Sequence, residues 1–190
     1  MLTQIGTLLI DSLGSLFVYT LLLRFHMQWL RAPFRNPIGE FVAAFTNWIV
    51  LPARRVVPGL FGLDLATLLF AWLAQALVMA LLMSIRGYAF ASAPGTAFLV
   101  LAAISGIELT RMSVNLLIGA AILQAVLSFV GPHSPLAPVL DALTRRFYAP
   151  FRRFIPPIGS IDLSPLFLVI AAQIVIIMLE WLRRLVASPF

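Results

Sequence analysis

The sequence predicts an all-α polytopic membrane protein with about four transmembrane helices in two parallel repeats, each with a short interfacial amphipathic helix. Three observations carry this prediction. First, 62% of the 190 residues are hydrophobic and only 11% are charged, whereas the surface of a soluble domain needs many more charges. Second, several apolar stretches are long enough to cross the ~30 Å hydrocarbon core of a bilayer. Third, one segment occurs twice.

The duplicated segment covers residues 36–75 and returns without a gap as residues 134–173. At this offset of 98 positions, twelve of the forty residues are identical, against about three expected for ordinary composition. An internal repeat of this length indicates a duplicated structural unit. The register is fixed by two arginine pairs, Arg54-Arg55 and Arg152-Arg153.

The first predicted repeat covers residues 1–88. Residues 5–30 form its first span, which we expect to be retained because no basic region and no convincing cleavage site mark it as a signal peptide. Residues 38–51 are too short to span and carry apolar residues at helical spacing. They are most simply an interfacial amphipathic helix, with a re-entrant segment as the alternative. Residues 65–85 form the second span, with Asp64 as its N-cap.

The second predicted repeat covers residues 103–190, after a connector or short helix at 89–102. Its spans are predicted at 103–130 and 165–182. Residues 97–107 are either an extension of the third span or a short separate helix, and we favour one long span.

Residues 135–149 repeat the interfacial helix, and a basic turn with Pro150 at its start follows them, because proline interrupts the helical hydrogen bonds. Ser164 is expected to cap the last span, with Pro165 as its first helical residue.

The distribution of arginine predicts the topology. Eight arginines fall in the two loops between the spans of each repeat, and three fall on the opposite side. The positive-inside rule therefore places both basic loops in the cytoplasm and both termini outside. The net charge of +6, next to apolar spans, indicates anionic lipid headgroups as partners rather than nucleic acid. The basic-loop arginines are Arg31, Arg35, Arg54, Arg55, Arg145, Arg146, Arg152 and Arg153.

Residues 144–173 read TRRFYAPFRRFIPPIGSIDLSPLFLVIAAQ and resemble the signature of the YggT family of bacterial inner-membrane proteins with relatives in plastids. The first copy departs from this pattern with Ala66-Thr67 where Ser-Pro is expected, so the two copies need not be equivalent. The resemblance implies no catalytic activity. It implies roles in membrane assembly or organisation, such as cytochrome maturation, cell division or tolerance of osmotic stress. The matching residues are Thr144, Pro150, Arg152, Arg153, Pro156, Pro157, Gly159, Asp162, Ser164 and Pro165.

The arginine pairs are the first candidate site. Guanidinium groups match phosphate and carboxylate geometry, so Arg54, Arg55, Arg152 and Arg153 are candidates for docking a protein partner or binding lipid headgroups. The alternative is topogenic, with positive charges that only keep a loop in the cytoplasm. Asp64 and Asp162 belong to this site and are expected to cap the following helices or to pair with the nearby arginines.

Polar residues within the spans are the second candidate site. Gln75 and Gln173 occupy equivalent positions and are expected to hydrogen-bond between helices or, as the alternative, to bind a substrate. Ionisable residues inside a membrane indicate function, and Glu108 and Arg111, three apart on one helix face, can neutralise each other. The candidates for a polar path are Asp11, Arg24, Glu108, Arg111 and Glu180.

We expect a non-enzymatic protein without cofactor or metal, because the sequence has no cysteine and no convincing catalytic or phosphate-binding pattern. The predicted role is to organise or assist assembly of other membrane components, with the basic turns as docking surface for an unidentified membrane protein. The alternative is a transporter or channel subunit that acts as a homo-oligomer in osmotic or ion homeostasis, because parallel repeats occur in transporters.

Overall fold

The computed structural model describes all residues except 61, 88–93, 131–133, 155–161 and 188–190. In the described part the regular structure is helical apart from one isolated bridge between Leu60 and Leu63, which confirms the predicted all-α class. Its helices are α1 (Leu2–Trp29), α2 (Pro37–Ala53), α3 (Leu65–Ile85), α4 (Pro94–Val130), α5 (Ala137–Phe154) and α6 (Ser164–Ala187). Four of them, α1, α3, α4 and α6, are long and apolar enough to cross a membrane, as predicted.

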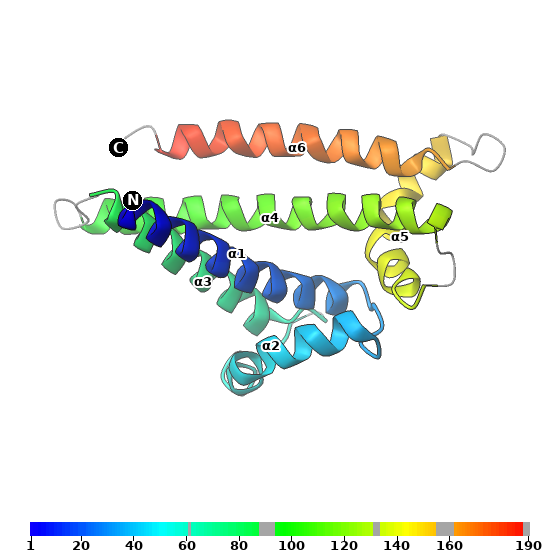
Figure 1. Cartoon of the computed structure of the whole chain (residues 1–190), viewed down its shortest axis with the longest axis horizontal. Helices are drawn as coiled ribbons and strands as arrows, with labels where there is room; N and C mark the ends of the chain where they lie inside the picture. The colour runs from blue at the N-terminus through cyan, green and yellow to red at the C-terminus, as the bar shows by residue number, and fades with distance from the viewer. Residues whose placement is uncertain (61, 88–93, 131–133, 155–161, 188–190) are drawn as a thin grey trace.

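The four long helices run side by side with alternating directions (Figure 1). α1 and α4 run from the end that holds the start of the chain toward the end that holds α2 and α5, and α3 and α6 return. The start of α1 and the end of α6 therefore lie at the same end of the molecule. Each repeat has the same order of a long helix, a short helix and a returning long helix.

The helices of one repeat pack mainly on each other, α1 on α3 and α4 on α6, and the repeats join where α3 and α1 meet α4. Among the described helices α6 contacts only α4 and α5, and it is the peripheral long helix. Gly14 lets α1 approach α3 closely, because a Cβ at this position would clash with the side chain of Val78. Buried apolar side chains from α1 and α4, such as Leu21, Leu22 and Met112, continue this core between the repeats.

α4 is one continuous helix of 37 residues, so residues 97–107 extend the third span and do not form a separate helix. At 1.5 Å per residue the helix is about 55 Å long and exceeds the hydrocarbon thickness of about 30 Å. Its first turns pack on α3, where the Trp72 indole Nε1 donates a hydrogen bond to the Ala102 carbonyl at 3.1 Å.

α2 and α5 lie at the end opposite the termini (Figure 1). Asn36 caps α2, because its Oδ1 accepts a hydrogen bond from Gly39 N at 3.0 Å, and Pro37 occupies the first helical position, where its missing N–H costs nothing. One face of α2 is buried through Thr46 and Val50. The other exposes aromatic side chains, of which Trp48 is 68% exposed. This two-sided pattern agrees with the amphipathic helix predicted at 38–51.

Both short helices continue past the proline that was expected to end them. α2 includes Pro52, and α5 includes Pro150 and the arginine pair Arg152-Arg153. The prediction that Arg152 and Arg153 lie in a turn after a helix ending at 149 is therefore wrong. A proline removes one helical hydrogen bond near the end of a helix but keeps a helical φ, so α2 continues for one residue after Pro52 and α5 for one turn after Pro150.

Candidate functional site

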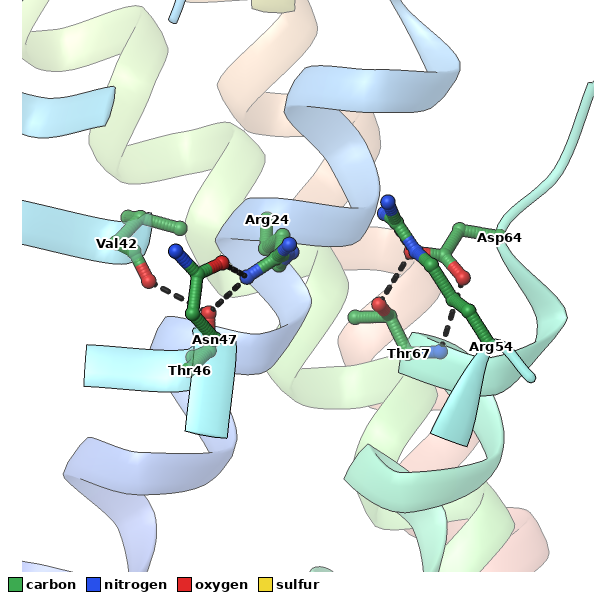
Figure 2. Close-up of polar contacts among 7 residues, drawn as sticks. All are labelled: Arg24, Val42, Thr46, Asn47, Arg54, Asp64 and Thr67. Carbon is green, nitrogen blue, oxygen red and sulfur yellow. Dashed lines mark hydrogen bonds and ion pairs between the residues drawn. The ribbon is translucent and has the colours of Figure 1, made fainter. Parts of the chain in front are cut away.

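The first arginine of the first pair is held by an aspartate ten residues later (Figure 2). Arg54 donates to Asp64 Oδ2 from Nη2 at 2.5 Å and from Nε at 3.2 Å. The same carboxylate caps α3, since it accepts the backbone N–H of Thr67 at 3.2 Å and the Thr67 hydroxyl at 2.5 Å. The ion pair therefore joins the end of α2 to the start of α3.

The second repeat makes the same connection at the same spacing. Arg152 donates to Asp162 Oδ2 from Nη2 at 2.8 Å and from Nε at 3.0 Å. Asp162 Oδ1 accepts the backbone N–H of Ser164 at 2.9 Å, because Pro165, at the position equivalent to Thr67, has no N–H to donate. α6 begins at Ser164, so the prediction of Ser164 as N-cap is wrong, and its hydroxyl has no hydrogen-bond partner among the described residues. The expectation that both aspartates cap helices or pair with arginines is confirmed.

These contacts shift the acidity of both aspartates. Burial acts to raise the pKa of the Asp64 carboxyl, but hydrogen bonds from Arg54 and Thr67 outweigh it and hold the pKa below its ordinary value. The pKa of Asp162 is lowered in the same way, since hydrogen bonds from Ser164 and from Arg152 outweigh the effect of burial. Both carboxylates are therefore ionised at neutral pH and balance one arginine each.

The second arginine of each pair is left available. Arg55 and Arg153 are exposed, and neither forms an ion pair with any residue that the structure describes. Each precedes an exposed apolar side chain, Val56 at 81% and Phe154 at 80%. The prediction from sequence gave both arginines of each pair the same role. The signal that separates them is the Asp at ten residues from the first arginine in both copies.

A buried arginine anchors α2 to α1 (Figure 2). Arg24 is only 5% exposed, and its Nη1 donates to Thr46 Oγ1 at 2.6 Å and to Asn47 Oδ1 at 2.8 Å. In the second repeat the buried Thr144 hydrogen-bonds with the side chain of Gln124 on α4. Sequence reasoning missed this structural role. The signal was the threonine that both copies retain, at 46 and 144.

A polar cavity of about 490 Å³ opens between the long helices, from the terminal end of the bundle toward its middle. Asp11, Gln75, Glu108 and Arg111 contribute to its lining. Arg111 Nε donates to both carboxylate oxygens of Glu108, at 3.0 and 3.1 Å, so the predicted pair exists.

The two equivalent glutamines have different surroundings. Gln75 is 6% exposed, and its Oε1 has no hydrogen-bond partner among the described residues. Gln173 is exposed on α6 and does not line this cavity. The structure therefore brings Asp11, Gln75, Glu108 and Arg111 together but leaves Gln173, Arg24 and Glu180 outside.

These features define a multi-pass, all-α membrane protein built from two similar helical units, each closed by an Arg–Asp pair at the same end. The chain belongs to the CCB3/YggT family, whose model matches it twice, at residues 3–85 and 103–183. One match falls in each predicted repeat.

Several bacterial proteins are similar over nearly the whole chain. An uncharacterized protein encoded in the proC 3′ region of Vibrio alginolyticus is 37% identical over 168 residues, or 87% of this chain and 88% of the relative. An uncharacterized protein of Pseudomonas aeruginosa is 33% identical over 169 residues, 88% and 84% of the two chains. The uncharacterized protein YggT of Escherichia coli K12 is 32% identical over 171 residues, 89% and 86%. No solved structure matches the chain.

Proposed function

We propose that this protein is a non-enzymatic organiser of the bacterial plasma membrane that docks an acidic segment of another membrane protein. Arg55 and Arg153 are the docking residues, with both basic loops in the cytoplasm. The observation that carries the proposal is that the two arginines of each pair have different surroundings, in the same way in both repeats. In each repeat one arginine fixes the loop to the next helix and the other remains exposed beside an apolar side chain.

The fixed geometry favours a protein partner over lipid headgroups. Attraction to an anionic membrane depends on how many positive charges lie near its surface. In each arginine pair, the ion pair with an aspartate cancels one of the two arginine charges. A specific partner instead gains from a preorganised surface, because less conformational freedom is lost on binding. The exposed guanidinium forks can bind carboxylates with two hydrogen bonds, and Val56 and Phe154 add apolar contact.

The test is photo-crosslinking in native membranes, with a photoreactive residue at position 56 or 154. We expect crosslinks to acidic segments of one membrane protein. Changing both Arg55 and Arg153 to Gln should lower their yield about fivefold, if each exposed pair contributes about 0.5 kcal/mol. The matched control changes Arg183 and Arg184 to Gln at the opposite end and should leave the yield unchanged.

Three results would overturn the proposal. Full crosslinking by the Arg55→Gln, Arg153→Gln variant would exclude these arginines from docking. Loss or inversion of membrane insertion in that variant would show that the charges are topogenic. Crosslinks only to lipid would assign the surface to headgroups.

A second candidate function is transport, and the polar cavity favours it. A half-buried Glu108–Arg111 pair and the unpartnered Gln75 amide oxygen lie inside a membrane-spanning bundle, where polar groups mark solute or ion paths. Four spans in one chain are few, so a pore would need several copies. Flux through proteoliposomes that is abolished by Glu108→Gln and Gln75→Leu, but retained in Gln173→Leu, would establish transport. Equal leakage by all variants would exclude it.

A further inference from the structure

An apolar groove of about 460 Å³ lies where α1, α4 and α5 meet, at the end opposite the polar cavity. Figure 1 shows α5 beside the end of α4, at the end of the bundle where α1 also ends. Leu23, Leu123 and Leu143 supply apolar walls, and Gly119 leaves open space, since a Cβ added there meets nothing within 4 Å. Neither docking nor transport as proposed above uses this groove.

The rim of the groove is basic and aromatic. Trp29 and Leu30 line it, and the Arg146 guanidinium stacks over the Trp29 ring with its Cζ at 5.7 Å from the centroid. Arg31 follows Leu30 directly. Both arginines are exposed and neither forms an ion pair with a described residue. An apolar groove that has the Arg146 guanidinium over its Trp29 and Arg31 next to its Leu30 in the chain is complementary to an anionic amphiphile.

The backbone at Arg31 is unusual. Arg31 has φ 55° and ends α1 in a Schellman motif, because Ala32 N donates to Met27 O at 2.7 Å and Arg31 N to Gln28 O at 3.2 Å. Glycine is the common residue at this left-handed position, where a Cβ is unfavourable. A residue that keeps an unfavourable backbone conformation at such a place points to a use for its side chain.

We propose that this groove binds one anionic phospholipid, with an acyl chain along α4 and the phosphate between Arg31 and Arg146. The volume decides against a helix of a partner protein. A helix is 10–12 Å across and rises 5.4 Å per turn, so 460 Å³ corresponds to roughly one turn. A free phosphate would leave the apolar walls unfilled, whereas a phospholipid satisfies both the walls and the rim.

The test is native mass spectrometry of the delipidated full-length protein, titrated with phosphatidylglycerol or with phosphatidylcholine of the same chains. We expect the wild type to bind one phosphatidylglycerol in preference to phosphatidylcholine. Arg31→Gly and Arg146→Gln should each weaken that binding about fivefold, the effect of one arginine near a membrane surface. Gly119→Leu should block the groove and remove binding of both lipids there.

Each variant has a control in which the same kind of substitution is made outside the groove. Arg55→Gln removes an equal charge at the same end, and Gly6→Leu places a leucine at another helical glycine with open space around it. Both should bind as the wild type does. Arg31→Gly removes the steric cost of the left-handed backbone at this position, and Gly119→Leu improves helix propensity. Thermal unfolding should therefore show that both variants are folded.

A separate measurement, the fluorescence of Trp29, locates the acyl chain of the bound lipid. Phosphatidylglycerol with brominated chains should quench a fluorescence component that Trp29→Phe removes. The proposal is overturned if Gly119→Leu retains full binding, if Arg31→Gly and Arg146→Gln bind phosphatidylglycerol as tightly as the wild type, or if both lipids bind equally. Quenching that is unchanged in Trp29→Phe would likewise place the lipid elsewhere.

Discussion

At the scale of single residues, the two Arg–Asp pairs have the same connectivity but different surroundings. The side chain of Asp64 is 8% exposed, whereas that of Asp162 is 37% exposed. Solvent screens exposed ion pairs strongly, so the first pair should stabilise its loop more than the second. Asp64 also accepts two hydrogen bonds from Thr67, and removing its charge would weaken the N-cap of α3 as well.

We therefore expect Asp64→Asn to lower the free energy of unfolding by about 1–2 kcal/mol and Asp162→Asn by less. The folded-state pKa of Asp64 lies below the ordinary value of 3.8. Its contribution is therefore fully present above about pH 3.8 and is lost as pH falls through the lower folded value. Thermal unfolding in detergent at pH 7 and pH 3 checks both statements. An effect of Asp64→Asn that grows as pH falls would contradict them.

At the scale of the helices, the short helices are fixed to the bundle by buried polar contacts as well as by apolar packing. Thr46 is fully buried, accepts a hydrogen bond from the Arg24 guanidinium and donates one to the Val42 carbonyl at 2.5 Å. Arg24 is 5% exposed as a residue, and its charge depends on such partners because a buried charge without them is costly. The angle at which α2 leaves the bundle thus depends on α1.

Replacing Thr46 by Val keeps the shape of the side chain but removes the oxygen. We expect a loss of about 1.5–3 kcal/mol, the range for hydrogen bonds to charged groups, together with faster hydrogen exchange in α2. Thr46→Ser should restore most of the stability. Thr110→Val is the control, because within the described part of the chain the Thr110 hydroxyl donates only to the Gly106 carbonyl of its own helix. Equal losses from Thr46→Val and Thr110→Val would show that the Arg24 contact contributes nothing.

Sequence patterns predicted the four long helices and the Arg–Asp pairing because these depend on local hydropathy and on a spacing that occurs twice. They did not predict the last residues of α2 or the last turn of α5, since Pro52 and Pro150 lie close enough to a helix end for one lost hydrogen bond to be tolerated. The end of the first span at residue 30 was predicted, but the left-handed backbone of Arg31 was not, because glycine is the residue that usually marks this conformation at a helix end.

At the scale of the whole molecule, two similar repeats form one asymmetric bundle. α3 packs on both α1 and α4, whereas α6 packs on α4 and α5 at the periphery. Gln75 therefore lies inside the polar cavity and Gln173 outside it, although their positions in the repeat are identical. No repeat pattern could have predicted this difference, because it arises from the packing of one repeat on the other. Of the two glutamines, a second copy of the chain beside α6 would change the surroundings of Gln173 and not those of Gln75.

The orientation of the whole bundle can be tested with single cysteines, because the sequence has none of its own. Val56→Cys and Phe154→Cys lie in the two basic loops, and Thr3→Cys lies at the terminal end. With parallel repeats the first two must react with an impermeant maleimide from the same side, and the third from the other. The positive-inside rule further predicts that intact cells label only Thr3→Cys and that inverted membrane vesicles label the other two.

The parallel arrangement of the repeats and the orientation of the bundle in the membrane are tested by different outcomes. Labelling of Val56→Cys and Phe154→Cys from opposite sides would contradict the parallel arrangement of the repeats. Labelling of both from outside intact cells would keep the arrangement and reverse the bundle. In that case the eight loop arginines would face away from the cytoplasm, and a docking partner would have to reach them from the outer side of the membrane.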